Sequence, residues 1–335
     1  MKKPVFLALC LLLVACQMEV EYSGEVSAPK LVVYAQYAYS PQYNDIRCYV
    51  QQSTFFLDDK PDNRFLSDAT VECQINGKTY PFTFYQDSNA YLPPEGMPPA
   101  STGDRLTMRV THPAYGTTSA TQTTPAAATC QISDTLLQTD TLSEYIEHAD
   151  DSSFTVYRTR LQIDLELGFY AYPLLSDDVI EVTAQAVYQP TPDSTYRRKA
   201  YLSTSDPFFL SLTADGDMGI IDDIVSLFGD EARRYDAFYI PTQSVRSSKS
   251  AKLKIFTPSS RDSVQSVVIT TRTMTRDAWL YHASVEQQSN LMGAVIGLGQ
   301  EEHVQVFGNF EGDVIGIFIA SAEQTIMIDF KHPQP

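Results

Sequence analysis

The hydrophobic residues of this chain follow, for most of its length, the two-residue period of β-strands. From Arg105 to Thr111, for example, Leu106, Met108 and Val110 alternate with polar residues. This alternation is typical of a strand with one buried face and one exposed face. Similar runs predict strands over residues 31–39, 46–56, 70–75, 78–84, 105–111, 117–123, 154–167, 179–189, 237–240, 252–256, 264–273, 314–320 and 325–330.

The clearest local signal is the Asn-Gly pair at positions 76–77, which separates two of these runs. Both residue types tolerate the positive φ angles of a type I′ turn, the usual connection of a two-residue β-hairpin. In that register Val71 faces Phe82 and Cys73 faces Tyr80. One face of the predicted hairpin is therefore apolar.

Two segments follow the helical period instead of the strand period. Apolar residues share one face between Asp217, which we expect to cap a helix, and Gly229, which would end it. Residues 277–288 carry a second apolar stripe, which includes Ala278 and Tyr281. The sequence thus predicts two short helices in an otherwise β-rich chain.

The spacing of the strands divides the chain into two β domains. Residues 30–125 hold about seven short strands, which is typical of an immunoglobulin-like β-sandwich. Residues 130–332 hold longer strands and predict a larger β-sandwich domain that contains the two short helices. A chain of 335 residues is also longer than one hydrophobic core usually organises. The predicted fold class is mostly β.

The first 15 residues have the pattern of a lipoprotein signal peptide. Two lysines precede an apolar run, and Leu-Val-Ala then leads directly to Cys16. The run is too short for a membrane-spanning helix, which argues against an uncleaved anchor. We therefore expect residues 1–15 to be removed and Cys16 to be acylated, so that lipid attaches the protein to the membrane. Residues 16–29 are polar and would form a tether.

The formal net charge of −17 makes nucleic acid an improbable partner, because a phosphate backbone would be repelled. Colloidal solubility explains this acidity without any ligand. The chain also lacks a Gly-x-Ser-x-Gly elbow, a His-Glu-x-x-His helix and a Gly-rich phosphate loop. We therefore expect a protein that is not an enzyme.

Three cysteines remain in the mature chain, Cys48, Cys73 and Cys130, and an odd number cannot all pair. Cys48 and Cys73 both lie on predicted strands of the first domain, and beyond the inner membrane they could form a disulfide. The alternative is two buried thiols that behave as small apolar residues. The sequence leaves both interpretations open.

Asp215 and Asp217 form the best candidate for a cation site, because alternating carboxylates in a glycine-containing loop suit hard cations such as Ca²⁺. The spacing lacks the later bidentate Glu of a helix-loop-helix calcium loop. The alternative, in which Asp217 caps the following helix, explains the acidity without a metal. We predict neither a metal nor another cofactor.

Aromatic side chains on loops can stack on sugars, peptides and other planar ligands. Tyr170 and Tyr172 lie in a stretch that we expect to be a loop between strands, and they are the ligand-binding candidates. A group of tyrosines near the start is better explained by ordinary strand composition. It comprises Tyr34, Tyr37, Tyr39, Tyr43 and Tyr49.

Motifs in both halves of the chain resemble a known family. They lie at residues 29–33, 67–71, 103–106, 112–116, 206–208, 286–288, 304–309 and 312–318. Together with the lipoprotein signal, these motifs are similar to the Bacteroidota lipoproteins grouped as domain of unknown function 4249. The resemblance implies a cell-envelope protein that is encoded beside a TonB-dependent outer-membrane transporter.

We therefore expect an outer-membrane lipoprotein, exposed at the cell surface, that serves as a non-enzymatic accessory or ligand-capture subunit of a TonB-dependent nutrient transporter. Its partners would be membrane lipid, through Cys16, and that transporter. An adhesin or envelope scaffold that binds another protein is the alternative. A hydrolase is the least favoured hypothesis, because no pair of nucleophile and base can be identified in the sequence.

Overall fold

The computed structural model describes residues 28–40, 44–53, 64–147, 153–170, 177–191, 194–204, 237–242, 249–258, 260, 264–285 and 306–330. As predicted, these residues are mostly β, with one large mixed sheet and a single helix at residues 276–285. The strands are β1 (Leu31–Tyr39), β2 (Asn44–Gln52), β3 (Thr70–Ile75), β4 (Lys78–Tyr85), β5 (Ala90–Leu92), β6 (Arg105–His112), β7 (Gly116–Thr123), β8 (Thr129–Glu147), β9 (Ser153–Tyr170), β10 (Val179–Thr191), β11 (Ser194–Ser203), β12 (Ala237–Pro241), β13 (Lys249–Phe256), β14 (Val264–Met274) and β15 (Val314–Asp329).

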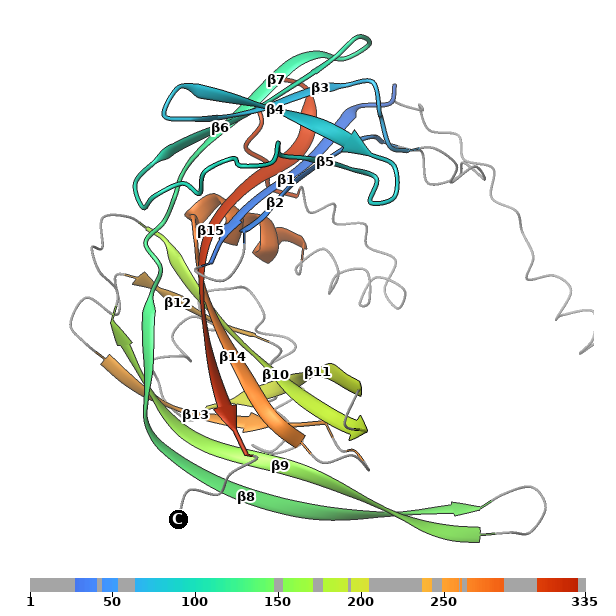
Figure 1. Cartoon of the computed structure of the whole chain (residues 1–335), viewed down its shortest axis with the longest axis vertical. Coiled ribbons are helices and arrows are strands. Elements are labelled where there is room, and N and C mark those ends of the chain that lie inside the picture. The colour runs from blue at the N-terminus through green and yellow to red at the C-terminus, as the bar shows by residue number, and fades with distance from the viewer. Residues whose placement is uncertain are drawn as a thin grey trace, which may run out of the picture.

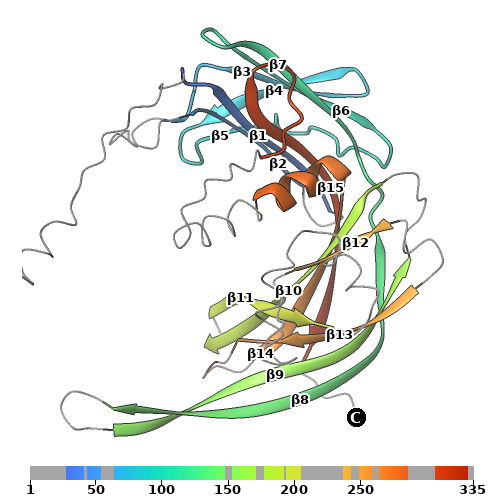
Figure 2. The same ribbon diagram turned by 180° about the vertical axis from the view of Figure 1, so that it is seen from behind.

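The strands form one continuous path, in the order β7-β6-β3-β4-β5-β2-β1-β15-β14-β10-β11-β13-β9-β8, and β12 pairs with β10 beside it. Figure 1 shows that this path curves into a C, with β1 to β7 in one half and β8 to β14 in the other. β15 runs through both halves (Figures 1 and 2). The helix lies on the side of β15 that faces into the C, which we call the inner face.

The first hydrophobic core lies in the N-terminal half, between two layers of the curved sheet. Val33 and Tyr37 of β1 and Cys48 of β2 belong to one layer, and Val71 of β3 and Met108 of β6 to the other. All five side chains are buried. The alternation of apolar and polar residues predicts this packing, because it leaves one apolar face on each strand.

The second core lies on the other half of the sheet. Ile180 of β10 and Ile269 of β14 meet Leu253 of β13 and Leu165 of β9 in a single cluster. These side chains are at most 4% exposed. The longer strands of the second half thus bury one face each, as their hydrophobic pattern predicts.

One strand, β15, contributes side chains to both cores. Phe318 and Ala320 belong to the first core, whereas Ile326 and Ile328 pack against the second. Successive side chains of a strand point to opposite faces, and all four residues have even numbers. The same face of β15 therefore serves both cores, while its odd-numbered side chains point to the inner face.

The two halves of β15 have different neighbours. Residues 314–322 pair with β1 in parallel, and residues 321–329 pair with β14 in antiparallel orientation. The C-terminal strand of the chain thus completes the N-terminal core. The first core thus includes residues from outside the range 30–125, namely Phe310, Phe318 and Ala320. The division into domains at 30–125 and 130–332 stays a prediction.

The predicted hairpin is confirmed. Asn76 and Gly77 have φ angles of 49° and 86°, as a type I′ turn requires. Val71 lies opposite Phe82, which is the predicted register. The strands predicted for the first half agree with β1, β2, β3, β4, β6 and β7 to within a few residues at their ends.

Two predictions in the second half are wrong. The sequence predicts two strands over 314–320 and 325–330, but β15 is a single strand. The polar residues between them, among them Ser321 and Glu323, do not form a turn, because pairing with β14 continues along them and buries both. β8 and β11 are not predicted at all, since their sequences are rich in polar residues and do not alternate regularly.

The described residues contain no helix that is long and apolar enough to cross a membrane. The helix predicted over residues 277–288 is confirmed at 276–285. The predicted signal peptide, Cys16 and the helix between Asp217 and Gly229 lie outside the described residues.

Replacing Gly316 should disturb the pairing of β1 with β15. A Cβ at Gly316 would lie 2.3 Å from the carbonyl oxygen of Val33, and a Cβ at Gly308 would lie 2.6 Å from the oxygen of Gly316. Because both obstacles are backbone atoms, the strands would have to shift. We expect Gly316→Ala to lower the free energy of unfolding by about 2 kcal/mol or more in chemical denaturation.

Ile315→Ala is the matched control, because this neighbouring side chain is 47% exposed. Its expected effect is within about 0.5 kcal/mol. A Gly316→Ala variant as stable as the wild type would contradict the close approach of β1 and β15.

Candidate functional site

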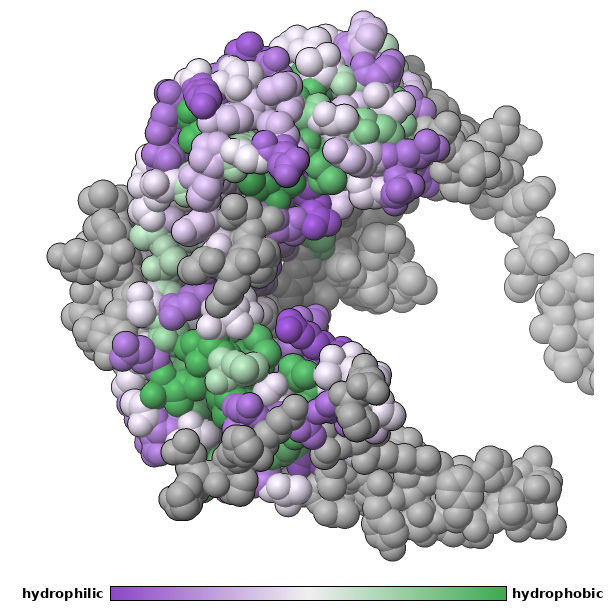
Figure 3. Space-filling model, in the orientation of Figure 1, coloured by the Kyte–Doolittle hydropathy of each residue, from purple (hydrophilic) through white to green (hydrophobic). Residues whose placement is uncertain are grey.

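Charged and aromatic side chains gather on the inner face of the central strands, the side that neither large core covers. In β1, for example, Val33 points to the first core, whereas Tyr34 and Gln36 point to the inner face. Figure 3 shows that the molecule is hollowed between its halves and that hydrophilic residues lie on both sides of the hollow. We call the following residues the inner-face cluster: Tyr34, Gln36, Asp45, Arg47, Tyr49, Glu181, Tyr239, Arg272, Tyr281, His282 and Glu323.

The first part of the cluster is a chain of hydrogen bonds across β1 and β2. The Tyr34 hydroxyl donates to Gln36 Oε1 at 3.3 Å, and Gln36 Nε2 donates to Asp45 Oδ2 at 3.1 Å. Arg47 Nε donates to Asp45 Oδ1 at 2.6 Å, and Arg47 Nη1 donates to the Tyr49 hydroxyl at 3.3 Å. The side chain of Arg47 is 42% exposed, so its guanidinium can also bind a molecule in the hollow.

The second part is a row of side chains across four neighbouring strands. Tyr239 of β12 lies opposite Glu181 of β10, which lies opposite Arg272 of β14, which lies opposite Glu323 of β15. Arg272 Nε donates to Glu323 Oε1 at 2.6 Å, and Arg272 Nη1 is 3.4 Å from Glu181 Oε2. The Tyr239 hydroxyl donates to Glu181 Oε1 at 3.3 Å. The side chain of Glu323 is only 3% exposed, so Arg272 compensates a buried charge.

The helix contributes two aromatic side chains, Tyr281 and His282, which lie between these two parts of the cluster. The ring centroid of Tyr281 is 6.1 Å from that of Tyr34 and 5.6 Å from that of His282. Burial raises the pKa of both tyrosines, so their hydroxyls stay protonated at neutral pH. Burial also lowers the pKa of His282, with Arg272 acting in the same direction and Glu181 against it. His282 is therefore neutral near pH 7.

The cluster is suited to binding through hydrogen bonds and ring contacts. It presents carboxylates, guanidinium groups, phenol hydroxyls and aromatic faces on one rigid sheet. Three carboxylates stand against two guanidinium groups, so the surface is slightly acidic. Within the described ranges, no three side chains of the metal-binding types lie together.

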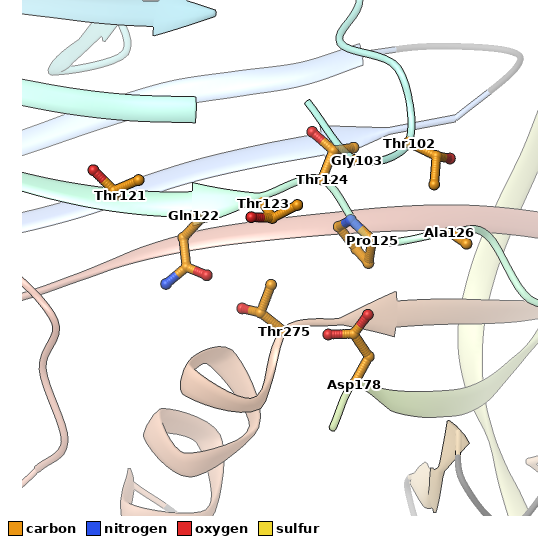
Figure 4. A pocket seen from close by; sticks show the side chains of 10 residues that line it. All are labelled: Thr102, Gly103, Thr121, Gln122, Thr123, Thr124, Pro125, Ala126, Asp178 and Thr275. Carbon is orange, nitrogen blue, oxygen red and sulfur yellow. The ribbon is translucent and has the colours of Figure 1, made fainter. Parts of the chain in front are cut away.

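A smaller cavity of about 310 Å³ lies where the two halves meet, beside the end of β7 (Figure 4). Five threonines contribute to its walls, together with Gln122 and Asp178. Thr124 and Thr275 are buried, and their hydroxyls have no hydrogen-bond partner in the described part of the chain. Gln122 Nε2 donates to Asp277 Oδ2 at 2.8 Å, which ties β7 to the helix. The cavity has room for water or a small hydroxylated molecule.

A family model with the description "Domain of unknown function (DUF4249)" matches residues 17–327. The chain belongs to this family. The resemblance in the sequence motifs is thereby confirmed. A comparison with curated proteins gives no match.

In this DUF4249 protein, the tyrosines lie in positions that differ from those the sequence predicts. Tyr170 is the last residue of β9 and not part of a loop, and Tyr172 lies outside the described residues. Of the tyrosines assigned to ordinary strand composition, Tyr37 is fully buried in the first core, but Tyr34 and Tyr49 belong to the inner-face cluster. A binding role of Tyr170 and Tyr172 stays a prediction.

The other predicted sites are placed as follows. Cys48 and Cys73 are free, buried thiols of the same core, and a disulfide between them stays a prediction. Burial raises the pKa of the Cys73 thiol to about 12, so the native thiol is unreactive at neutral pH. Asp215 and Asp217 lie outside the described residues.

Removing Arg272 should take away the guanidinium that faces the buried carboxylate of Glu323. We expect Arg272→Ala to lower the free energy of unfolding by about 3 kcal/mol, measured by chemical denaturation. Adding Glu323→Gln should recover part of this loss, because the buried group is then uncharged. Equal losses in the single and the double variant would show that Arg272 acts through packing and not through charge.

The lowered pKa of His282 predicts a pH dependence of stability. Its folded pKa lies below the ordinary value of 6.5, so the unfolded chain binds the proton more tightly. The contribution of neutral His282 is complete above about pH 6.5 and is lost as the pH falls through that value toward the folded pKa. Thermal melting between about pH 7.5 and 5 should therefore show a steeper loss for the wild type than for His282→Gln. Parallel curves would contradict this effect, since the carboxylates titrate in both proteins.

Proposed function

We propose that this protein is a lipid-anchored outer-membrane protein, exposed at the cell surface, that serves a TonB-dependent nutrient transporter as a non-enzymatic accessory or ligand-capture subunit. The inner-face cluster is its contact surface. The binding step is recognition by a preformed sheet face, without covalent chemistry.

The sequence around Cys16 supports the anchor. A basic start, a short apolar run and a small residue precede this cysteine. The family match begins at residue 17, directly after Cys16, so the matched region starts where the mature, acylated chain would start. Acyl chains would then hold the body close to outer-membrane proteins.

The observation that carries the binding proposal is the position of the inner-face cluster. Polar groups at a surface normally face open solvent singly, whereas these half-buried groups share one face of a sheet beside the hollow (Figure 3). Side chains on strands are held more precisely than side chains on loops, so the surface needs little rearrangement to bind. Arginine and tyrosine are also the residues most enriched at protein–protein contacts.

The chemistry of the cluster favours certain ligands over others. Its slightly acidic charge and exposed Arg47 suit a ligand that offers both hydrogen-bond donors and acceptors. The rings of Tyr34, Tyr49 and Tyr281 suit a planar or apolar face. A sugar or a peptide segment combines these properties.

Affinity purification of the tagged full-length protein from gently solubilised outer membranes tests the proposal. We expect a TonB-dependent transporter to copurify with the wild type and to be lost with Cys16→Ala, which cannot be acylated. Arg47→Ala should stay in the membrane but recover about tenfold less transporter, as expected for an interfacial arginine.

Arg109→Ala is the matched control, because Arg109 lies on the exposed face of β6, away from the inner face. It should recover as much transporter as the wild type. Copurification of adhesive or surface-layer proteins in place of a transporter would overturn the proposal in favour of an envelope scaffold.

A further inference from the structure

The two outermost strands of the sheet differ in how their outer edges are covered. β7 and β8 are the ends of the strand path. The edge of β7 is covered: Glu311 N donates to the oxygen of Ser119 at 3.0 Å, and the hydroxyl of Thr118 donates to the oxygen of Glu311. No strand in the described part of the chain pairs with the outer edge of β8. β8 thus presents a long row of backbone groups.

In the described part of the chain, side chains of β14 and β15, which belong to the body of the molecule, cover the beginning of this edge. Ala128 N donates to the hydroxyl of Thr273 at 3.0 Å, and Cys130 N donates to Gln324 Oε1 at 2.9 Å. A β-bulge follows between Ile132 and Asp134, and the body's cover ends there in the described structure. Among the described residues, β8 from residue 133 onward is paired with β9 on one side only.

The outward N–H groups of this edge can be identified. Thr135 N bonds to the side chain of its neighbour Asp134 at 2.9 Å, so this N–H points away from β9. In an antiparallel pair, inward and outward groups alternate along the strand. The N–H groups of Leu137, Thr139 and Thr141 therefore also point outward, where another strand can accept them.

The end of the β8–β9 hairpin would gain stability from a third strand. β13 pairs with β9 over residues 162–169, whereas β8 is the one described strand that pairs with residues 153–160 of β9. Both views show this arm projecting from the body, on the side to which the C opens (Figures 1 and 2). An isolated two-stranded ribbon is only marginally stable in water. Nearer the body on β8, where β13 still pairs with β9, Leu136 and Leu137 are 56% and 45% exposed.

β8 lacks the usual protection of an edge strand. Proteins block such edges with prolines, lysines or very short strands. β8 has 19 residues and contains neither proline nor lysine. Its charged residues are all acidic: Asp134, Asp140, Glu144 and Glu147.

We propose that the outer edge of β8, from Ser133 to Glu147, is a strand-addition site for an extended, basic segment of a partner protein. Main-chain hydrogen bonds supply the affinity, and the acidic composition of β8 favours a segment that carries lysine or arginine. A second copy of this chain fits less well, because two β8 strands whose charged residues are all acidic would repel each other. This site is separate from the inner-face cluster and does not depend on it.

The test uses the purified mature protein and two short labelled peptides, one alternating lysine with valine and one alternating glutamate with valine. We expect the basic peptide to bind and the acidic peptide not to bind, by fluorescence anisotropy. Thr139→Pro removes an outward N–H and leaves the bonds to β9 intact, so it should weaken binding by about tenfold or more. Thr139→Ala keeps the N–H and should bind like the wild type.

Circular dichroism and thermal melting establish that both variants are folded, and Leu137→Pro repeats the test at an independent outward position. Equal binding to wild type and both proline variants would overturn the proposal, since attraction to the acidic protein as a whole would then explain it. Dimers that form in the wild type and vanish in Thr139→Pro would overturn it in favour of a second copy. Arg47→Ala should leave peptide binding unchanged, which separates this result from the transporter test.

Discussion

The pairing of β15 with β1 on one side and β14 on the other is the interaction on which the rest of the structure depends. It joins residues that are up to 283 positions apart in sequence, since Leu31 pairs with Val314 and Ser266 with Asp329. Because side chains alternate, this one strand places its even-numbered residues in both cores and its odd-numbered residues on the inner face. A shift of one residue would exchange the two sets and expose the apolar one.

The inner-face cluster is a consequence of this register. Glu323 lies just beyond the stretch of β15 that pairs with β1, where the strand passes from one half to the other. Burying a carboxylate there costs free energy of desolvation unless a positively charged group contacts it. Arg272 lies directly opposite on β14 and also reaches Glu181 on the next strand. Where β15 passes from one half to the other, ion pairs thus stabilise the sheet. Within each half, apolar packing stabilises it.

The sequence predicts those features that depend on neighbouring residues. The Asn-Gly hairpin and the alternation in β6 are local signals, and both agree with the structure. The sequence pattern divides β15 in two, because Glu323 is polar. The residue that pairs with Glu323, Arg272, is 51 positions away in sequence, so no local pattern reveals the contact. The inner-face cluster was missed for the same reason. Its only sequence signal is the two-residue spacing of Asp45, Arg47 and Tyr49.

The two surfaces proposed for binding depend on different parts of the fold. The inner face consists of side chains from six strands and the helix, so its geometry exists only when β15 joins both halves. The edge of β8 consists of backbone groups, and its outer part depends on β9 alone. A change at one surface should therefore leave the other intact, because no described contact of the arm beyond residue 133 involves the inner face. The two proposals, a contact surface in the hollow and a strand-addition site on β8, are therefore compatible within one chain.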